Sequence, residues 1–491
     1  MSGGNKGAVR LISANDNSRL DELEKLLDEI ENIDIADLAY STGKDEDPSV
    51  NLGIRVYNKE LWSGNYVGIC KLKYKDHRTE RNLVDKDGRE VILKIEPRFK
   101  VSVPDMLNFV SSDEEFETYL APQTTNNTKQ GKAEDTINNK LFRFSEDEDP
   151  IFVEDELLTK NSSIITAANF ICMLKALCLR PLMGKMLAKE ENLTGKVKGK
   201  ILISKNIRMN TIRGRDDRIY CRYLQYSEDI PENQVLKAAL KKAVAVLNKY
   251  FNKTDTKKNT LMEIAGYCGN SLSHISVAKI SRQDFTKIRP TGCYAYYKPV
   301  INIARMVLDE VSADADGQVK FTGYVVPYAV SMNRLYEMYA RTYIKENLKT
   351  KEWGMAPYDA VISVLKENNK YYIGGTVKPD VILYSPKEAE NDKFDPKNKK
   401  YKYTVLDVKY KKSDNMSHAR EDRLQLLAYA LMYNCDTVGL IFPPLDRPAD
   451  GEENKPKKEE CEINIQGGAD KPRKYIQVVL PIEKPGQDTK T

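Results

Sequence analysis

Two apolar segments near the C-terminal end decide the expected fold, Thr376-Val-Lys-Pro-Asp-Val-Ile-Leu-Tyr384 and Tyr403-Thr-Val-Leu-Asp-Val-Lys-Tyr410. Each has the short apolar run that is typical of a β-strand. Successive side chains of a strand point to opposite faces of the sheet, so Asp407 and Lys409 lie on the same face. If the two strands are neighbours, Asp380 at the start of the first can converge with them. The sequence therefore predicts a site with two carboxylates and one ammonium.

This set of side chains is typical of metal-assisted phosphodiester hydrolysis. Carboxylate oxygens bind Mg²⁺, and a bound metal polarises a phosphate and acidifies a water molecule. We expect Asp380 and Asp407 to be ligands of Mg²⁺, with Mn²⁺ as a substitute, and the backbone carbonyl of Val408 to be a third ligand. Lys409 is expected to contact the scissile phosphate or the attacking water.

The alternative is that this Asp-x-Lys motif is a chance occurrence. In a chain with 30% charged residues the motif recurs, at Asp255–Lys257, Asp395–Lys397 and Asp488–Lys490. These copies lie in polar, lysine-rich or terminal stretches without a strand pattern, which indicates solvated loops. Asp407–Lys409 differs because it lies in an apolar alternation and follows a Pro-Asp strand. Taken alone, a short motif of this kind has a high false-positive rate.

Helical patterns flank the two predicted strands. Downstream, residues 423–433 predict a helix on which Gln425 and Tyr429 share one face, because they are four residues apart. Upstream, residues 328–345 also have helical spacing, and Glu337 lies off the apolar stripe. From spacing alone, Glu337 could be an ordinary solvated carboxylate, and Gln425 and Tyr429 could form the polar edge of a surface helix.

The order of these motifs resembles the PD-(D/E)xK nuclease superfamily and, more closely, the McrC-like nuclease subunit of McrBC-type (5-methylcytosine) restriction systems. The motifs that carry the resemblance are Met332-Asn-x-Leu-Tyr-Glu337, Lys378-Pro-Asp-Val-Ile-Leu383, Leu406-Asp-Val-Lys-Tyr-Lys411 and Gln425-x-x-x-Tyr429. Earlier segments are similar too, among them Asn65–Ile69 and Gly199–Tyr223. The resemblance spans roughly residues 60–445.

The resemblance implies further roles and a partner. Glu337 would complete the metal site, and Gln425 and Tyr429 would orient the site or the DNA. The chain would cut double-stranded DNA and stimulate a separate AAA+ GTPase, which docks on the β-rich N-terminal part. The sequence agrees with this division because it has no phosphate-binding loop, and Gly195-Lys-Val-Lys-Gly-Lys200 has the wrong spacing for one.

Composition limits the remaining classes. The 77 basic and 72 acidic residues leave a net charge of +5, so contacts with nucleic acid must come from local patches. With three histidines, a histidine-rich zinc site is excluded. The most apolar stretch, Ile164 to Met183, is interrupted by Lys175 and Arg180, which indicates a core helix and no membrane span. The N-terminus lacks the apolar segment of a signal peptide, so we expect a soluble cytoplasmic protein.

The expected fold class is α+β multidomain, with a β-rich N-terminal domain, a helical middle and a C-terminal α/β PD-(D/E)xK nuclease core. The expected parts are an acidic helix and tail (1–49), a β-rich partner-docking domain (50–121), a polar linker (122–151), a mainly helical middle (152–317) and the endonuclease domain (318–491). In the middle we expect helices at 162–190, 232–252, 258–280 and 296–310, and a strand pair near 199–224. In the last part we expect a closing strand at 475–481 after a disordered stretch, 446–474. A chain without residues 1–125 is expected to keep the nuclease fold.

Two further points stay open at the level of sequence. The basic stretch Lys205, Arg208, Arg213, Arg215 and Arg218 could contact phosphates, face an acidic partner, or be solvated and balanced by neighbouring aspartates. Two other functions compete with the restriction subunit. One is a stand-alone PD-(D/E)xK nuclease in DNA repair. The other is a non-catalytic activator or scaffold of an AAA+ partner.

Overall fold

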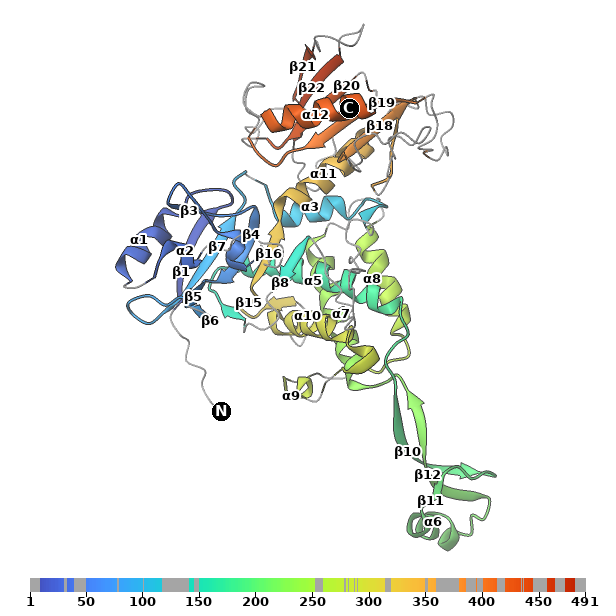
Figure 1. The fold of residues 1–491 in the computed structure, drawn as a ribbon. Coiled ribbons are helices and arrows are strands. Elements are labelled where there is room, and N and C mark those ends of the chain that lie inside the picture. Colours follow the sequence, from blue (N-terminus) through green and yellow to red (C-terminus); the bar gives the residue numbers. More distant parts are fainter. Residues whose placement is uncertain are drawn as a thin grey trace, which may run out of the picture.

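The chain folds as a mixed α+β protein with several sheets, which confirms the α+β class (Figure 1). The computed structural model describes residues 9–30, 33–38, 50–76, 79–99, 101–116, 141–144, 150–251, 259–277, 280, 282–286, 288, 290–313, 319–348, 352–358, 379–385, 394, 401–412, 420–433, 435, 437–444, 457–463 and 473–481. The three other Asp-x-Lys copies lie outside these residues, as does most of the expected linker.

A five-stranded sheet organises the N-terminal part, in the order β1-β7-β4-β16-β8. Its strands are β1 (Val9–Asn15), β7 (Glu90–Glu96), β4 (Tyr66–Lys71), β16 (Tyr328–Ser331) and β8 (Phe142–Phe144). Helix α1 (Asp21–Glu29) buries three leucines against this part. Around it are α2 (Ile35–Leu38), η1 (Val50–Gly53), and the small pairs β2 (Arg55–Tyr57) with β3 (Glu60–Trp62) and β5 (Lys73–Asp76) with β6 (Thr79–Asn82).

The membership of this sheet corrects three of the expected boundaries. Strand β1 pairs in parallel with β7 along its whole length, so residues 9–30 belong to the β-rich part and are no separate tail. Strand β8 comes from the expected linker. Strand β16 comes from a segment that was expected to be helical. It is a strand because Tyr328, Ala329 and Val330 are all buried and pair with strands on both sides.

Helices form the middle of the molecule: α5 (Glu156–Cys178), α7 (Pro231–Tyr250), α8 (Thr260–Ser271) and α10 (Tyr297–Glu310). Helix α5 packs against the other three, and every residue from Ser162 to Leu174 is buried. By length and composition α5 could cross a membrane, but 78% of its most apolar window is buried inside the protein. It is the expected core helix. It ends at Cys178, shorter than expected, because a strand begins at residue 185.

A long hairpin projects from this helical part (Figure 1). Strand β10 (Lys185–Thr194) pairs antiparallel with β12 (Arg218–Ser227), and the short β11 (Lys200–Ile201) pairs with β12 near the tip. The strand pair expected near 199–224 is therefore confirmed, but its main partner, β10, was partly assigned to a helix. The sequence of β10 is rich in good helix formers, so pairing with β12 overrides local propensity. Helix α6 (Ile203–Met209) and η2 (Thr211–Arg213) carry most of the basic stretch at the tip.

The C-terminal sheet has six strands in the order β17-β18-β19-β20-β22-β21. They are β17 (Gly354–Met355), β18 (Val381–Ser385), β19 (Lys402–Val408), β20 (Thr437–Phe442), β22 (Arg473–Val479) and β21 (Lys457–Ile463). The expected closing strand is confirmed as β22. Strand β21 corrects the expectation of disorder, because residues 457–463 pair with β22 along their whole length.

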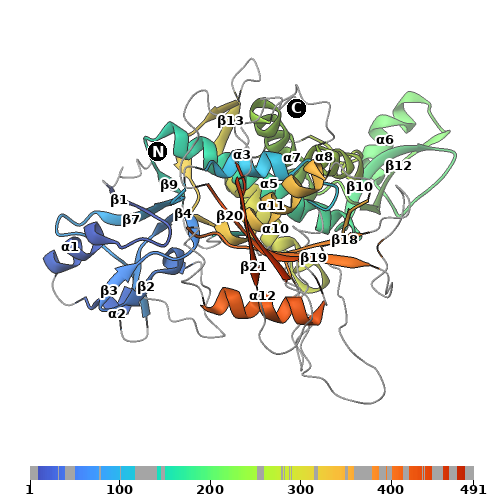
Figure 2. The ribbon, with the colours of Figure 1, turned by 90° about the horizontal axis from the view of Figure 1, so that it is seen from above.

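Alternation along these strands gives the sheet two distinct faces. Leu406 and Ile441 pack into the large core that also contains α11 (Met332–Asn347) and the N-terminal sheet. Val405 and Leu440 pack into a second core with α12 (Arg420–Met432). Figure 2 shows α12 along the outer side of this sheet. A chain without residues 1–125 would lose part of the large core and expose β16, so it is no clean test of the nuclease part.

Candidate active site

The pairing of β18 with β19 brings the two predicted aspartates together. Val381 pairs with Leu406 in an antiparallel register, so Asp380 and Asp407 are the next opposed positions. The backbone N–H of Val408 donates to Asp380 Oδ2 at 2.8 Å. Both aspartates share the parity of Val405 and Ile382, and they therefore face α12. Asp380, Asp407 and Lys409 therefore lie together on one face of the sheet, as predicted.

Helix α12 supplies a hydrogen-bonded frame for these groups. Lys409 Nζ lies 2.6 Å from Asp407 Oδ2 and donates to Gln425 Oε1 at 2.9 Å. Gln425 Nε2 lies 2.7 Å from the Tyr429 hydroxyl, which is 3.3 Å from Asp407 Oδ1. Gln425 and Tyr429 face the site together because they are one helical turn apart. They are partners of the catalytic candidates and do not form a solvated helix edge.

The electrostatics of the site reflect crowded negative charge. Burial, reinforced by Glu337 and Asp407, raises the pKa of Asp380 to about 8, although the Val408 N–H and Lys409 oppose the rise. Burial alone would lower the pKa of Lys409, but Asp407, Asp422 and Asp380 raise it overall. Lys409 is therefore held as a cation, and the acids around it favour a second positive group nearby.

The carboxylate oxygens of this site are the ligand type that a hard divalent cation prefers. In the described part of the chain, however, three acidic side chains are not gathered around one point. Among the residues that the structure describes, no three Asp, Glu, His or Cys side chains are close enough together to hold a metal ion. Glu337 acts on Asp380 through its charge and lies 3.5 Å from Arg334. Asp407 Oδ2 is buried and, apart from the ion pair with Lys409, has no hydrogen-bond donor aligned with it. Carboxylate oxygens of this kind suit Mg²⁺ or Mn²⁺, with Asp380 and Asp407 as the holding residues.

Comparison with known families identifies the chain. A family model described as "McrBC 5-methylcytosine restriction system component" matches residues 109–443, more than half of the sequence. This chain belongs to that family. The resemblance to McrBC-type systems is therefore confirmed, and the matched range contains the whole Asp380–Asp407–Lys409 cluster and its frame from α12.

Two solved structures are similar to this McrBC-family chain. One is a refined half-complex from a tetradecameric assembly of Thermococcus gammatolerans McrB AAA+ hexamers with bound McrC, at 14% identity and a TM-score of 0.37, covering 96% of this chain and 94% of that chain. The other is a cryo-EM structure of the Thermococcus gammatolerans McrBC complex, at 14% identity and a TM-score of 0.27, covering 70% and 89%. No curated protein gives a significant match.

Sequence reasoning missed two residues that contact the candidate site of this McrBC-family chain. Asp422 lies 3.7 Å from Lys409 and pairs with Lys411. Arg341 is buried and donates to the backbone carbonyl of Asp380. Helical spacing could have found both, because Asp422 is three residues before Gln425 and Arg341 is four residues after Glu337.

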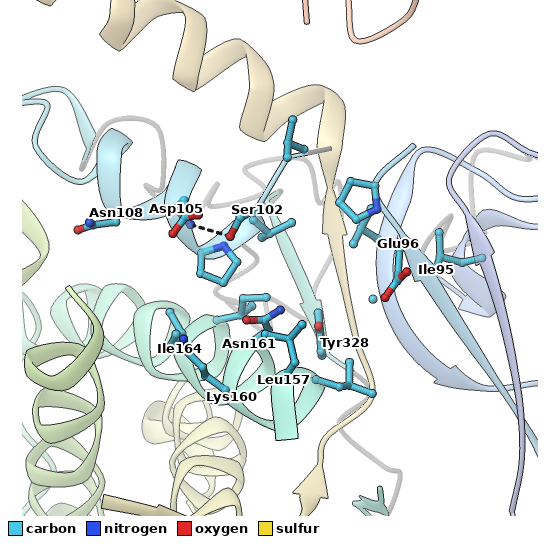
Figure 3. A pocket seen from close by; sticks show the side chains of 18 of the residues that line it. Ile95, Glu96, Ser102, Asp105, Asn108, Leu157, Lys160, Asn161, Ile164 and Tyr328 are labelled. Atoms are coloured by element: carbon cyan, nitrogen blue, oxygen red, sulfur yellow. Dashed lines mark hydrogen bonds between the residues drawn. The ribbon is translucent and has the colours of Figure 1, made fainter. Parts of the chain in front are cut away.

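A cavity of about 650 Å³ lies elsewhere, between the N-terminal sheet, α3 (Val103–Val110) and α5 (Figure 3). Ser102 and Asp105 line it from α3, and Lys160 and Asn161 from α5. Ser102 is occupied in capping α3, since its side chain accepts from the Asp105 N–H. The cavity contains none of the predicted site residues, so volume alone does not locate the chemistry.

Proposed function

We propose that this chain is the metal-dependent DNA endonuclease subunit of a two-component McrBC-like restriction system, with a PD-(D/E)xK core at its C-terminal end. The observation that carries the proposal is the cluster of Asp380, Asp407 and Lys409 on one face of a sheet. Their side chains come from neighbouring strands, and hydrogen bonds with α12 hold Asp407 and Lys409. Family membership alone supports a restriction component, and the cluster adds the chemistry.

In this proposal Asp380 and Asp407, with the backbone carbonyl of Val408, hold Mg²⁺ or Mn²⁺. When bound, the ion supplies a Lewis acid that polarises the scissile phosphate and lowers the pKa of a water ligand. Lys409 contacts the phosphate or the attacking water, and Gln425 Oε1 aims its ammonium. Tyr429 in turn holds Gln425 and Asp407. Glu337 on α11 acts on Asp380 through its charge and, by resemblance, would complete the metal site.

The direct test is substitution of the cluster. Asp380→Ala, Asp407→Ala and Lys409→Ala are each expected to reduce cleavage of double-stranded DNA by about a hundredfold or more, because each removes a metal ligand or a charge stabiliser. The assay uses the full chain with its GTPase partner, GTP and Mg²⁺. Arg305→Ala, an exposed change on α10, is the control. Wild-type cutting by either aspartate variant would refute the assignment.

The choice of metal is a separate test of the same site. Mn²⁺ is expected to replace Mg²⁺ in the cleavage assay, Ca²⁺ to support little cleavage, and EDTA to stop cleavage.

The partner in this proposal is an AAA+ GTPase of the McrB kind, acting with the chain on double-stranded DNA in the cytoplasm. This chain lacks a phosphate-binding loop, so another chain must supply nucleotide hydrolysis. The resemblance to McrC-like subunits implies that the β-rich N-terminal part is the docking element. The structure offers a second surface, because Ile203, Ile212 and Leu224 on the projecting hairpin are 68%, 75% and 63% exposed. Exposed apolar groups of this kind are typical of protein interfaces.

Paired variants decide between the two surfaces. Ile203→Asp with Ile212→Asp changes the hairpin tip, and Val56→Asp with Tyr57→Asp changes an exposed strand of the N-terminal part. The pair that lies in the interface is expected to weaken binding of the GTPase by about tenfold or more, and the other pair to leave it unchanged. Binding is measured by calorimetry. Unfolding curves of both variants check that neither change disrupts the chain.

The two competing functions predict different outcomes with the same proteins. A stand-alone repair nuclease would cut DNA well without partner or nucleotide. A non-catalytic scaffold would raise GTP turnover but support no cutting under any condition. The described cluster argues against the scaffold, because a scaffold has no chemical need for two acids and a lysine on one face. Cleavage by the lone chain is the result that would favour the repair nuclease.

A further inference from the structure

Two arginines outside the C-terminal sheet donate to backbone carbonyls beside β18 and β19, the strands next to the candidate site. The first is Arg341 on α11, which is 2% exposed. Its guanidinium donates to the carbonyl of Asp380 and to the carbonyl of Ala356 at 3.1 Å. It also pairs with Glu115 at 3.2 Å, next to α3. One side chain thus ties the residue that carries a metal-binding carboxylate to α11 and to the N-terminal half.

The second is Arg98, which follows β7 in the N-terminal sheet. Arg98 donates to the carbonyl of Tyr410, the residue directly after Lys409, and its guanidinium lies 4.8 Å from the centre of the Tyr410 ring. Arg98 is itself fixed by the buried Asp16, whose Oδ1 accepts the Arg98 backbone N–H at 2.5 Å. On the other side of Tyr410, the backbone N–H of Lys409 donates to Ile441 O at 2.8 Å. The backbone that carries Lys409 is therefore held from both sides.

The two contacts share one pattern. Each arginine binds a main-chain carbonyl at or next to a catalytic candidate, and each is paired with an acid from the first 116 residues, Asp16 or Glu115. A planar guanidinium presents its donors in one rigid fork, whereas the ammonium of a lysine rotates on a flexible stem. A small displacement of a catalytic group is costly to the reaction, so contacts that set strand position bear directly on rate.

We propose that Arg98 and Arg341 are positioning residues that set the separation of Asp380 and Lys409, and that the N-terminal half of the chain thereby takes part in DNA cleavage. This inference rests on the proposed nuclease function. It adds that the N-terminal half does more than dock a partner. The contact between Val408 N–H and Asp380 Oδ2 spans the two strands, so it reports their relative position directly.

The main variants are Arg98→Met and Arg341→Met, and the milder variants are Arg98→Lys, Arg341→Lys and Glu115→Gln. The matched control is Lys242→Met. Lys242 is a partly buried cation that donates to the carbonyls of Leu308 and Val311, far along the chain from the catalytic strands. In the full chain with its partner, the methionine variants are expected to lower kcat for cleavage by about tenfold to a hundredfold. KM for DNA, GTPase binding and GTP turnover are expected to stay within about twofold, and the lysine variants to recover part of kcat.

Hydrogen exchange gives a readout that does not depend on activity. Amide exchange at Val408 is expected to accelerate in the arginine variants and to stay unchanged in the Lys242→Met control. Wild-type kcat and wild-type Val408 exchange in Arg98→Met and Arg341→Met, or equal losses in the Lys242 control, would overturn the proposal. If Asp407→Ala cuts normally, the nuclease function fails instead, and exchange at Val408 still decides whether the arginines set the strand geometry.

Discussion

At the residue scale, the site depends on side chains that support one another. Asp407 is 3% exposed and has Lys409, Gln425 and Tyr429 within reach of its two oxygens. Gln425 is the common partner, because it contacts both the lysine and the tyrosine. Losing it removes the amide oxygen that accepts from Lys409, whereas losing the Tyr429 hydroxyl leaves that acceptor in place.

A graded pair of substitutions follows from this arrangement. Gln425→Ala is expected to reduce kcat by about tenfold to a hundredfold, as is usual for residues that orient catalytic groups, and Tyr429→Phe by less than about tenfold. Single-turnover cleavage with saturating partner measures both. Leu424→Ala, an exposed change on the same helix, is the control. A larger loss for Tyr429→Phe than for Gln425→Ala would show that the tyrosine, and not the glutamine, orients the site.

At the scale of elements, a buried acid joins two helices to the segment that leads into β16. Glu310 ends α10 and is fully buried; its Oε1 accepts from Ser162 of α5 at 2.6 Å and from the Val326 N–H at 3.1 Å. Burial raises the pKa of Glu310 from its ordinary value of 4.5 to about 7. The folded chain therefore binds this proton more tightly than the unfolded chain does. The stability that results is complete below pH 4.5 and is lost as the pH rises through about 7.

Glu310→Gln tests this linkage, since the amide keeps the shape and cannot ionise. The variant is expected to gain free energy of unfolding relative to wild type as the pH is raised from 5 to 8, because wild type alone must bury a charge at the higher pH. Urea unfolding at both pH values measures the difference. Glu263→Gln, an acid on α8, is the control. Parallel pH profiles for wild type and Glu310→Gln would contradict the raised pKa.

At the scale of the whole molecule, the proposed docking surfaces and the proposed cleavage site lie in different regions of the chain. The isolated chain is expected to hydrolyse no GTP and to cut DNA poorly, because it lacks a phosphate-binding loop and has a modest net charge. Mixed with its GTPase, it should form a stable complex and raise GTP turnover severalfold. The Asp407→Ala chain should raise turnover equally, since Asp407 lies inside the C-terminal sheet. Turnover assays with and without the chain measure this, and failure of Asp407→Ala to stimulate would place the two activities in one site.

The sequence by itself determined which residues of the candidate site share a face. Alternation with period two placed Asp407 and Lys409 on one side of a strand, and four-residue spacing placed Gln425 and Tyr429 on one side of a helix. Both rules act over a few residues, so they can be read from a local pattern. The same holds for the apolar core helix α5 and for the closing strand β22.

Only the tertiary structure decided the rest. Strands β8 and β16 join β1, β4 and β7 from segments far along the chain, and no local signal records which strands will pair. The charged strand β10 has good helix formers, and its pairing with β12 overrides them. Arg98 and Arg341 reach the catalytic strands across the fold, through backbone carbonyls that every residue type carries. Such contacts depend on the path of the chain in space, and so a one-dimensional pattern cannot show them.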